Sequence, residues 1–172
     1  MGRNVEIKAR LRNRAKAEAI AESLSTQPSE VIVQNDVFFP CTGGKLKLRI
    51  FSEDHGELIT YHRPTGTAPR TSNYTIVPTD HPLELHQALE IALGTIGKVK
   101  KTRTLYRIGQ TRVHLDRVEN LGEFIELEVV LRPEQTEAEG KVIADELMVQ
   151  LGINAADLIA VSYVDLIAAR GR

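Results

Sequence analysis

The sequence predicts an α+β fold, in which about eight antiparallel strands close into a barrel and helices pack against its outside. Apolar and polar residues alternate along many short segments, which is typical of strands because successive side chains point to opposite faces. Turns containing Gly, Pro, Asn or Asp separate these segments, and only a few stretches have helical spacing. With 172 residues the chain has the usual size of one domain, so we expect a single domain over residues 1–172.

The strands are predicted from this alternation in chain order. The first has an apolar face and a wholly charged face, which carries Glu6, Lys8 and Arg10. In the last, Glu126 and Glu128 share one face and apolar residues occupy the other. The predicted strands are Val5–Arg10, Val31–Phe39, Lys45–Ile50, Glu57–Arg63, Ser72–Val77, Lys98–Ile108, Thr111–Arg117 and Phe124–Val130.

Helical spacing of apolar residues predicts four helices. Pro82 suits a first turn, Thr136 opens a capping-box pattern, and Gly94 and Gly152 suit helix ends. Asn154 is the expected N-cap of the last helix. The predicted ranges are Arg14 to Leu24, Pro82 to Gly94, Thr136 to Gly152 and Ala155 to Ala169, and a mobile loop is expected from Pro64 to Asn73.

The composition excludes several classes of protein. A formal net charge of -1 gives no reason to expect a nucleic-acid partner. No apolar run approaches the roughly 18 residues that a membrane span requires. The N-terminus is charged from Arg3 onward and shows no secretory signal, so we expect a cytoplasmic protein. Cys41 is the only cysteine, which excludes an intramolecular disulfide, and we interpret it as incidental.

The charged strand faces have two explanations. In an open antiparallel sheet they would line the solvent side. In a closed barrel of about eight strands they would line an interior that can hold a small ligand. Buried unpaired charges cost several kcal/mol each, so a charged interior requires a charged ligand, and a metal-triphosphate complex compensates both signs.

Cations outnumber carboxylates among the residues that a closed barrel would turn inward. Along residues 98–108 the spacing does not choose between Lys98 with Lys100 and Lys101 with Arg103. The five histidines lack a helical metal-binding spacing, and we expect most of them to be solvated. The inward candidates are Glu6, Lys8, Arg10, Lys47, Arg49, Arg63, Lys101, Arg103, Arg112, Asp116, Glu126 and Glu128.

Several motifs resemble the CYTH superfamily, the triphosphate tunnel metalloenzymes. These are Val-Glu-Ile-Lys at residues 5–8, Gln-Asn-Asp-Val-Phe-Phe at 34–39, Leu-Lys-Leu-Arg at 46–49 and the run from Leu115 to Glu128. That last run, Leu-Asp-x-Val-Glu-x-Leu-Gly-x-Phe-x-Glu-x-Glu, is most similar to class IV adenylyl cyclases. The resemblance extends from about Val5 to Leu166. It implies an antiparallel barrel forming a tunnel, with carboxylates that hold Mg²⁺ or Mn²⁺ and basic side chains that grip phosphates.

The resemblance also implies roles for individual residues. Glu6, Glu126 and Glu128 would be metal ligands, and Asp116 would assist the metal or the nucleotide sugar. The family's opening Glu-x-Glu-x-Lys has Asn4 at its first position here, so we expect weaker metal binding or a shift towards Mn²⁺. His62 is an alternative to Arg63, because a one-residue slip swaps strand faces. The triphosphate would be held by Lys8, Arg49, Arg63, Lys101 and Arg103, with Arg10, Lys47 and Arg112 as further candidates and Lys8, Arg103 and Asp116 as the catalytic group.

Three functions are compatible with these residues. By the resemblance, the first is a cyclase that converts ATP to cyclic AMP and pyrophosphate. The second is a triphosphatase acting on tripolyphosphate, thiamine triphosphate or a nucleoside triphosphate. The third is a protein that binds polyphosphate or nucleotide without turnover, which Asn4 would favour. The expected partner is ATP or another triphosphate, and the resemblance is compatible with a homodimer.

Overall fold

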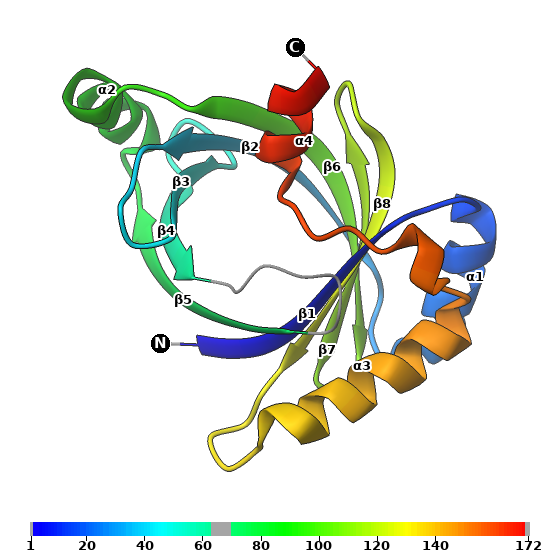
Figure 1. The fold of residues 1–172 in the computed structure, drawn as a ribbon. Coiled ribbons are helices and arrows are strands. Elements are labelled where there is room, and N and C mark those ends of the chain that lie inside the picture. Colours follow the sequence, from blue (N-terminus) through cyan, green and yellow to red (C-terminus); the bar gives the residue numbers. More distant parts are fainter. Residues whose placement is uncertain (1, 63–69, 171–172) are drawn as a thin grey trace.

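The strands of the protein close into a barrel. The computed structural model describes residues 2–62 and 70–170, and among these the strand order is β1-β5-β4-β3-β2-β6-β7-β8, with every pair antiparallel and β8 returning to β1 (Figure 1). The closed barrel is confirmed, so the open sheet is excluded. The strands are β1 (Gly2–Arg10), β2 (Glu30–Phe39), β3 (Lys45–Ile50), β4 (Gly56–His62), β5 (Arg70–Thr79), β6 (Gly97–Ile108), β7 (Thr111–Val118) and β8 (Gly122–Val130).

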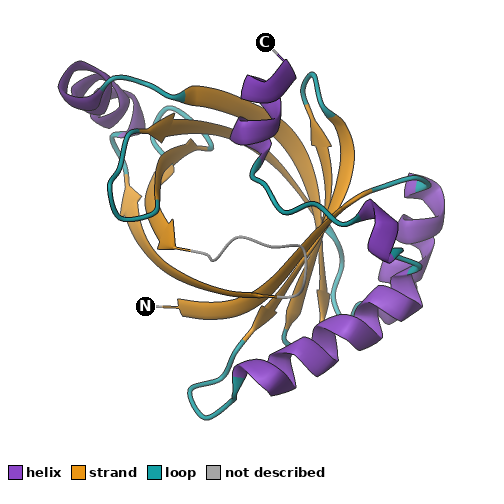
Figure 2. Cartoon of the chain, in the orientation of Figure 1, coloured by secondary structure: helices purple, strands orange, loops and turns teal. Residues whose placement is uncertain are grey.

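The helices lie outside the ring of strands (Figure 2). The capping box at Thr136 is confirmed, since its hydroxyl accepts from the Glu139 backbone N–H and its own N–H donates to the Glu139 carboxylate. Of the helices in the described part of the chain, none has both the length and the apolar character needed to cross a membrane. They are α1 (Arg14–Leu24), α2 (Pro82–Leu93), α3 (Glu137–Leu151), the short 3₁₀ helix η1 (Ala155–Asp157) and α4 (Tyr163–Arg170).

The main hydrophobic core lies between the barrel wall and the helices, rather than inside the barrel. The outward side chains of β1, β7 and β8 pack against α1 and α3, and Val5, Leu115 and Leu127 are fully buried there. Gly140 permits the close approach of α3, because a Cβ at this position would lie 2.7 Å from Val5 Cγ2 and 2.6 Å from Leu131 Cδ2. Covering the outer wall with helices leaves the inner wall available for polar residues.

The single helix predicted from Ala155 to Ala169 is wrong. Asn154 precedes only the 3₁₀ turn of η1, and its side chain makes no capping hydrogen bond. The chain then runs extended beside β1, where Leu158 pairs with Ala9 and the Ile159 N–H donates to the Lys8 carbonyl at 2.8 Å. Helix α4 begins afresh at Tyr163. Pairing with a strand distant in sequence therefore interrupts a segment whose local spacing is helical.

The loop predicted from Pro64 to Asn73 is too long at its C-terminal end. Residues 70–73 belong to β5 and pair with β1, in the register that places Ser72 opposite Asn4. The backbone pairing with β1 overrides the turn-forming composition of this stretch. Residues 64–69 lie outside the described chain.

Candidate active site

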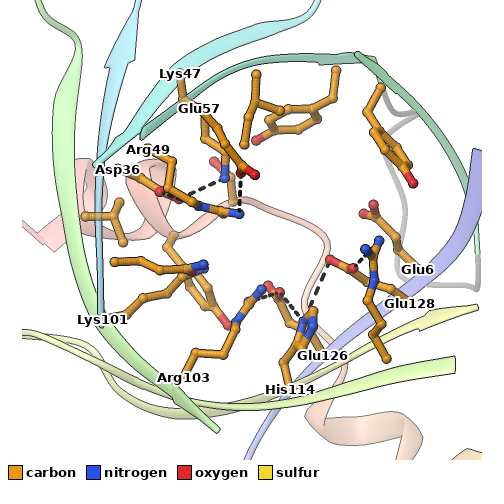
Figure 3. A pocket seen from close by; sticks show the side chains of 18 of the residues that line it. Glu6, Asp36, Lys47, Arg49, Glu57, Lys101, Arg103, His114, Glu126 and Glu128 are labelled. Carbon is orange, nitrogen blue, oxygen red and sulfur yellow. Dashed lines mark hydrogen bonds and ion pairs between the residues drawn. The ribbon is translucent and has the colours of Figure 1, made fainter. Parts of the chain in front are cut away.

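The barrel encloses a cavity of about 300 Å³ whose wall carries charges of both signs beside apolar residues. Figure 3 shows Glu6, Glu126 and Glu128 gathered on one side, and Asp36, Lys47 and Arg49 on the other. Asp36 and Glu57 also face inward, so cations and carboxylates nearly balance in the cavity wall. The observed excess of cations is therefore much smaller than predicted. The charged lining residues that the structure describes are Glu6, Lys8, Asp36, Lys47, Arg49, Glu57, Lys101, Arg103, Arg112, Glu126 and Glu128.

The acidic side of the cavity is built by three adjacent strands. Glu6 of β1 lies directly opposite Glu128 of β8, and His114 of β7 lies opposite Glu126. One ligand atom each of His114, Glu126 and Glu128 lies within 4.8 Å of the others, a spacing at which they can hold a metal ion. The register of β1, β7 and β8 therefore brings Glu126 and Glu128 together with a histidine, and it places Glu6 opposite Glu128 but outside this group of three.

His114 is buried and suited to bind a cation. Its Nδ1 lies 3.9 Å from Glu126 Oε2 and 3.8 Å from Glu128 Oε1, and it has no hydrogen-bond partner among the described residues. Burial and the nearby Arg103 lower the pKa of His114, which favours the neutral imidazole that ligates metals. Carboxylates suit Mg²⁺ and Mn²⁺, and imidazole adds a ligand that favours transition metals. The residues present therefore fit a divalent cation.

Glu126 stands at the junction between the acidic side and the cations. Its carboxylate lies 3.1 Å from Lys8 Nζ and 2.6 Å from Arg103 Nη2. Burial opposes ionisation, but Lys8 and Arg103 outweigh it and hold the pKa of Glu126 well below its usual range. Glu126 is thus a carboxylate ready to accept a metal, and it meanwhile restrains two cations.

Asp116 lies behind Arg103 and is absent from the cavity wall. Both of its oxygens accept from Arg103, at 2.6 Å each, and Lys101 Nζ lies 3.6 Å away. Burial acts against its ionisation, yet Arg103 and Lys101 lower the pKa of Asp116 to about 2. A fully buried carboxylate in a two-pronged contact fixes the guanidinium plane. The geometry therefore favours a role for Asp116 in orienting Arg103 over contact with a metal or a sugar.

A second buried carboxylate orients two further cations. Asp36 of β2 accepts from Lys47 at 2.8 Å and from Arg49 at 2.9 Å and 3.2 Å. Burial, the neighbouring Arg49 and Lys101 lower the pKa of Lys47 to about 7, against the opposing effect of Asp36. Lys47 can therefore exist in both protonation states near neutral pH.

Tyr163 reaches the cavity from the start of α4. Its ring lies 4.0 Å from Lys8 Nζ and 5.2 Å from Lys101 Nζ, measured to the ring centroid. Its hydroxyl donates to Asp116 Oδ2 at 3.0 Å. One side chain of the C-terminal segment therefore contacts two cations and the carboxylate that holds a third.

Asn4 lies at the edge of the acidic side and is almost completely buried. With its amide nitrogen turned towards the acceptors, it donates to the Ser72 carbonyl at 3.2 Å and to Glu6 Oε1 at 3.1 Å. An amide in this orientation stabilises the Glu6 carboxylate and offers no charge of its own to a cation.

The structure places most, but not all, of the predicted site residues together. On β6 it turns Lys101 and Arg103 inward, and leaves Lys98 and Lys100 exposed. Arg10 is exposed at the end of β1 and does not line the cavity, and Arg63 lies outside the described residues. His62 is exposed.

The cavity residues that were not predicted include Asp36, Glu57, His114 and Tyr163. His114 stands between the predicted inward residues Arg112 and Asp116, so the two-residue period of β7 contained the signal. Glu57 of β4 shares the inward face with Ile59, two residues further along the strand. Tyr163 was not recognised because the sequence predicts one continuous helix around it, whereas its position depends on the extended segment before α4.

Comparison with known proteins gives a family and a fold. The family model of the CYTH domain matches residues 2–163. The PH1012 protein of Pyrococcus horikoshii OT3 is 21% identical, with a TM-score of 0.84 over 95% of this chain and 98% of that chain. A candidate adenylate cyclase from Vibrio parahaemolyticus is 20% identical, with a TM-score of 0.75 over 96% and 97%.

A more distant similarity is to a candidate adenylyl cyclase from Hippeastrum in which triphosphatase activity is dominant. It is 14% identical, with a TM-score of 0.64 over 98% of this chain and 95% of that chain. Similarities at these identities show the fold. No curated protein matches the sequence.

Proposed function

The chain belongs to the CYTH domain family, and we propose that it is a divalent-metal-dependent enzyme that converts ATP to cyclic AMP and pyrophosphate. The observation that carries the proposal is the network of ion pairs inside the barrel, centred on Glu126 with Lys8 and Arg103. Each charge there is compensated by a group that a ligand can replace. A triphosphate is a partner for the cations, and a divalent metal is a partner for the carboxylates.

The metal would be held by Glu6, Glu126 and Glu128, with His114 as a fourth donor. This donor set fits Mg²⁺ or Mn²⁺, because carboxylate oxygens dominate it. When bound, such an ion supplies positive charge that polarises a phosphoryl oxygen.

The phosphates would be held by Lys8, Arg49, Lys101, Arg103 and Arg112. Arginine offers a planar pair of donors to two oxygens, and lysine acts as a compact charge. Asp116 and Asp36 keep Arg103 and Arg49 oriented before the substrate arrives. Preorganised cations of this kind stabilise the charge that develops on the leaving phosphates.

Lys47 adds a cation to the phosphate site when the substrate is bound. With a pKa of about 7 it is partly neutral in the free protein, and the charge of a bound triphosphate favours its ammonium form. In the cyclisation the ribose 3′-oxygen forms a bond to the α-phosphorus and loses its proton to solvent. The bond from the α-phosphorus to the bridging oxygen breaks, and pyrophosphate leaves with that electron pair.

Triphosphate hydrolysis is the second candidate function. In this reaction water would attack a terminal phosphorus, lose its proton to solvent and release orthophosphate. The dominant triphosphatase activity of the Hippeastrum relative supports this alternative. The two reactions share their phosphate and metal sites and differ in the nucleophile.

Separating the products by chromatography tests the function directly. Purified protein is incubated with ATP, and separately with tripolyphosphate, in Mg²⁺ and in Mn²⁺. Cyclic AMP with pyrophosphate supports the cyclase, whereas ADP with orthophosphate supports the triphosphatase. Tight binding of both compounds without any product would instead favour a non-catalytic binding protein.

Two substitutions test whether the reaction belongs to this cavity. We expect Glu126→Ala and Lys8→Ala each to lower turnover by about 100-fold or more with the barrel retained, because each removes a charged partner of the substrate complex. Lys100→Ala, on the exposed face of β6, is the matched control and should keep full activity. Near-normal turnover in both cavity variants would contradict the site assignment.

A further inference from the structure

One arc of the cavity wall is uncharged. We call it the inner apolar platform and define it as Ile59 and Tyr61 of β4 with Tyr74 and Ile76 of β5. Ile59 lies directly opposite Ile76 in the sheet, and Tyr61 lies opposite Tyr74, so the four side chains form two adjacent cross-strand pairs. Strands β4 and β5 lie between β3 and β1, which places the platform on the arc between Glu57 and Glu6 in Figure 3.

The platform differs from the lining parts of β1, β3, β6 and β7, each of which carries a cation. Among the described lining residues, those of β4 and β5 include no cation, and Glu57 is their only carboxylate. The platform therefore has no charge with which to attract a phosphate group. Tyr74 is half-buried and Ile76 is 41% exposed, so part of this apolar surface remains in contact with water in the free protein. Covering it with an apolar group is favourable.

The position of the platform connects it to both charged sides. Lys47 lies directly opposite Ile59 across the β3–β4 pair, and Asn4, two residues from Glu6, lies opposite Ser72 across the β1–β5 pair. A triphosphate held by the cations would therefore carry any attached group towards this surface. Paired aromatic side chains offer rings on which a flat group can stack, and their hydroxyls offer polar contacts to its edge.

We propose that the inner apolar platform binds a flat ring attached to the triphosphate, so that the substrate is an organic triphosphate such as a nucleoside triphosphate, in preference to inorganic tripolyphosphate. This rests on the proposed function, because it presumes that the cations of the same cavity hold the triphosphate. It goes further by assigning the recognition of the organic group to β4 and β5.

The test compares two non-hydrolysable ligands, α,β-methylene-ATP and diimidotriphosphate, by calorimetry in Mg²⁺. Tyr74→Thr removes the ring and keeps a residue that favours strands, whereas Tyr74→Phe keeps the ring. We expect Tyr74→Thr to weaken the binding of α,β-methylene-ATP about tenfold and to leave diimidotriphosphate within about twofold. Tyr74→Phe should bind both ligands nearly as the wild type does.

A matched control distinguishes an effect of the inner wall from a general effect on strand β5. Thr75→Ala alters the exposed outer face of the same strand and should change neither affinity. Equal weakening of both ligands by Tyr74→Thr, or no weakening of either, would overturn the platform proposal and leave the proposed function intact. If the wild type bound neither ligand, the proposed function would fail, and the platform proposal with it.

Discussion

At the scale of single residues, the environment of Lys47 makes its charge dependent on pH. Its pKa of about 7 lies below the ordinary value of 10.5, so the ammonium form is present below about pH 7 and is lost as the pH rises through that value. Asp36, Arg49 and Lys101 are the charged neighbours that act on it from β2, β3 and β6. A polyanion in the cavity favours the ammonium form and raises this pKa again.

Triphosphate binding at about pH 8 should therefore be accompanied by the uptake of up to about one proton. Calorimetry in buffers with different ionisation enthalpies measures this uptake, with a non-hydrolysable triphosphate as ligand. Lys47→Arg stays cationic throughout, so it should bind with little or no proton uptake and with less loss of affinity between about pH 6.5 and 8.5. Identical proton uptake in the wild type and Lys47→Arg would rule out Lys47 as the titrating group.

The amide of Asn4 leads to a prediction about metal affinity. Asn4→Glu places a second carboxylate beside Glu6, and each added carboxylate increases the attraction for a cation. We expect the half-saturating Mg²⁺ concentration for activity to fall about tenfold, with a smaller change for Mn²⁺. Asn4→Gln introduces a side chain as long as that of Asn4→Glu but without its charge, and it should leave both metal titrations unchanged. Superimposable titrations for Asn4→Glu and the wild type would refute this role.

The two-residue period of a strand explains which site residues were predictable. It identified Glu6, Lys8 and Glu126, because their neighbours in sequence are apolar and the polar face is unmistakable. On β6 both faces are basic, so only the folded structure, in which Val99, Lys101 and Arg103 line the cavity, shows which face points inward. His114 followed the same period, but the expectation of solvated histidines concealed it.

At the scale of elements, the C-terminal segment joins the outside of the barrel to its interior. Leu158 and Ile159 pair with β1, and a few residues later the Tyr163 ring contacts Lys8, while Val164 packs in the hydrophobic cluster next to it. Lys45 and Asp165, paired at 2.8 Å, tie α4 to β3. We infer that Tyr163 is a positioning residue for the phosphate-binding cations.

Two substitutions distinguish the contribution of the Tyr163 ring to substrate binding from that of its hydroxyl. Tyr163→Leu should raise the KM for the triphosphate about tenfold with a small effect on kcat, because Lys8 and Lys101 lose their contact with the ring. Tyr163→Phe keeps the ring and should raise KM only about two- to threefold. Val164→Ala destabilises the same helix without touching the cations, so it should lower the melting temperature and leave KM unchanged. If Val164→Ala raised KM as much as Tyr163→Leu at equal loss of stability, the role would be structural only.

The elements themselves were predicted well where local signals decide them. The β3 strand and α1 have the predicted bounds, and the other strands differ from prediction by a few residues at their ends. Both failures, the long last helix and the long loop, occur where the chain pairs with β1. Such pairing depends on residues more than 60 positions away in sequence, so no local pattern contains it.

At the scale of the whole molecule, the barrel has its main apolar core outside and its charges inside. Helices α1 and α3 cover the outer wall, so the inner wall can be polar without loss of the core. The interior charges compensate each other in the free protein, as Glu126 does with Lys8 and Arg103. A ligand of one sign that enters alone must break these pairs and leave buried charges of the other sign unpaired.

Metal and triphosphate should consequently stabilise the protein cooperatively. A triphosphate that takes Lys8 and Arg103 removes both cations from Glu126, and a metal that takes Glu126 removes that carboxylate from Lys8 and Arg103. When both ligands bind together, each group keeps a partner of opposite charge. We expect the rise in melting temperature with Mn²⁺ and a non-hydrolysable triphosphate together to exceed the sum of the separate rises. Glu126→Gln removes the carboxylate that loses its cations when triphosphate binds alone. Triphosphate alone should therefore stabilise this variant more than the wild type, and Mn²⁺ should add little further stabilisation. Additive shifts in the wild type, or the same response to triphosphate alone in both proteins, would show that the two ligands do not compete for one network of ion pairs.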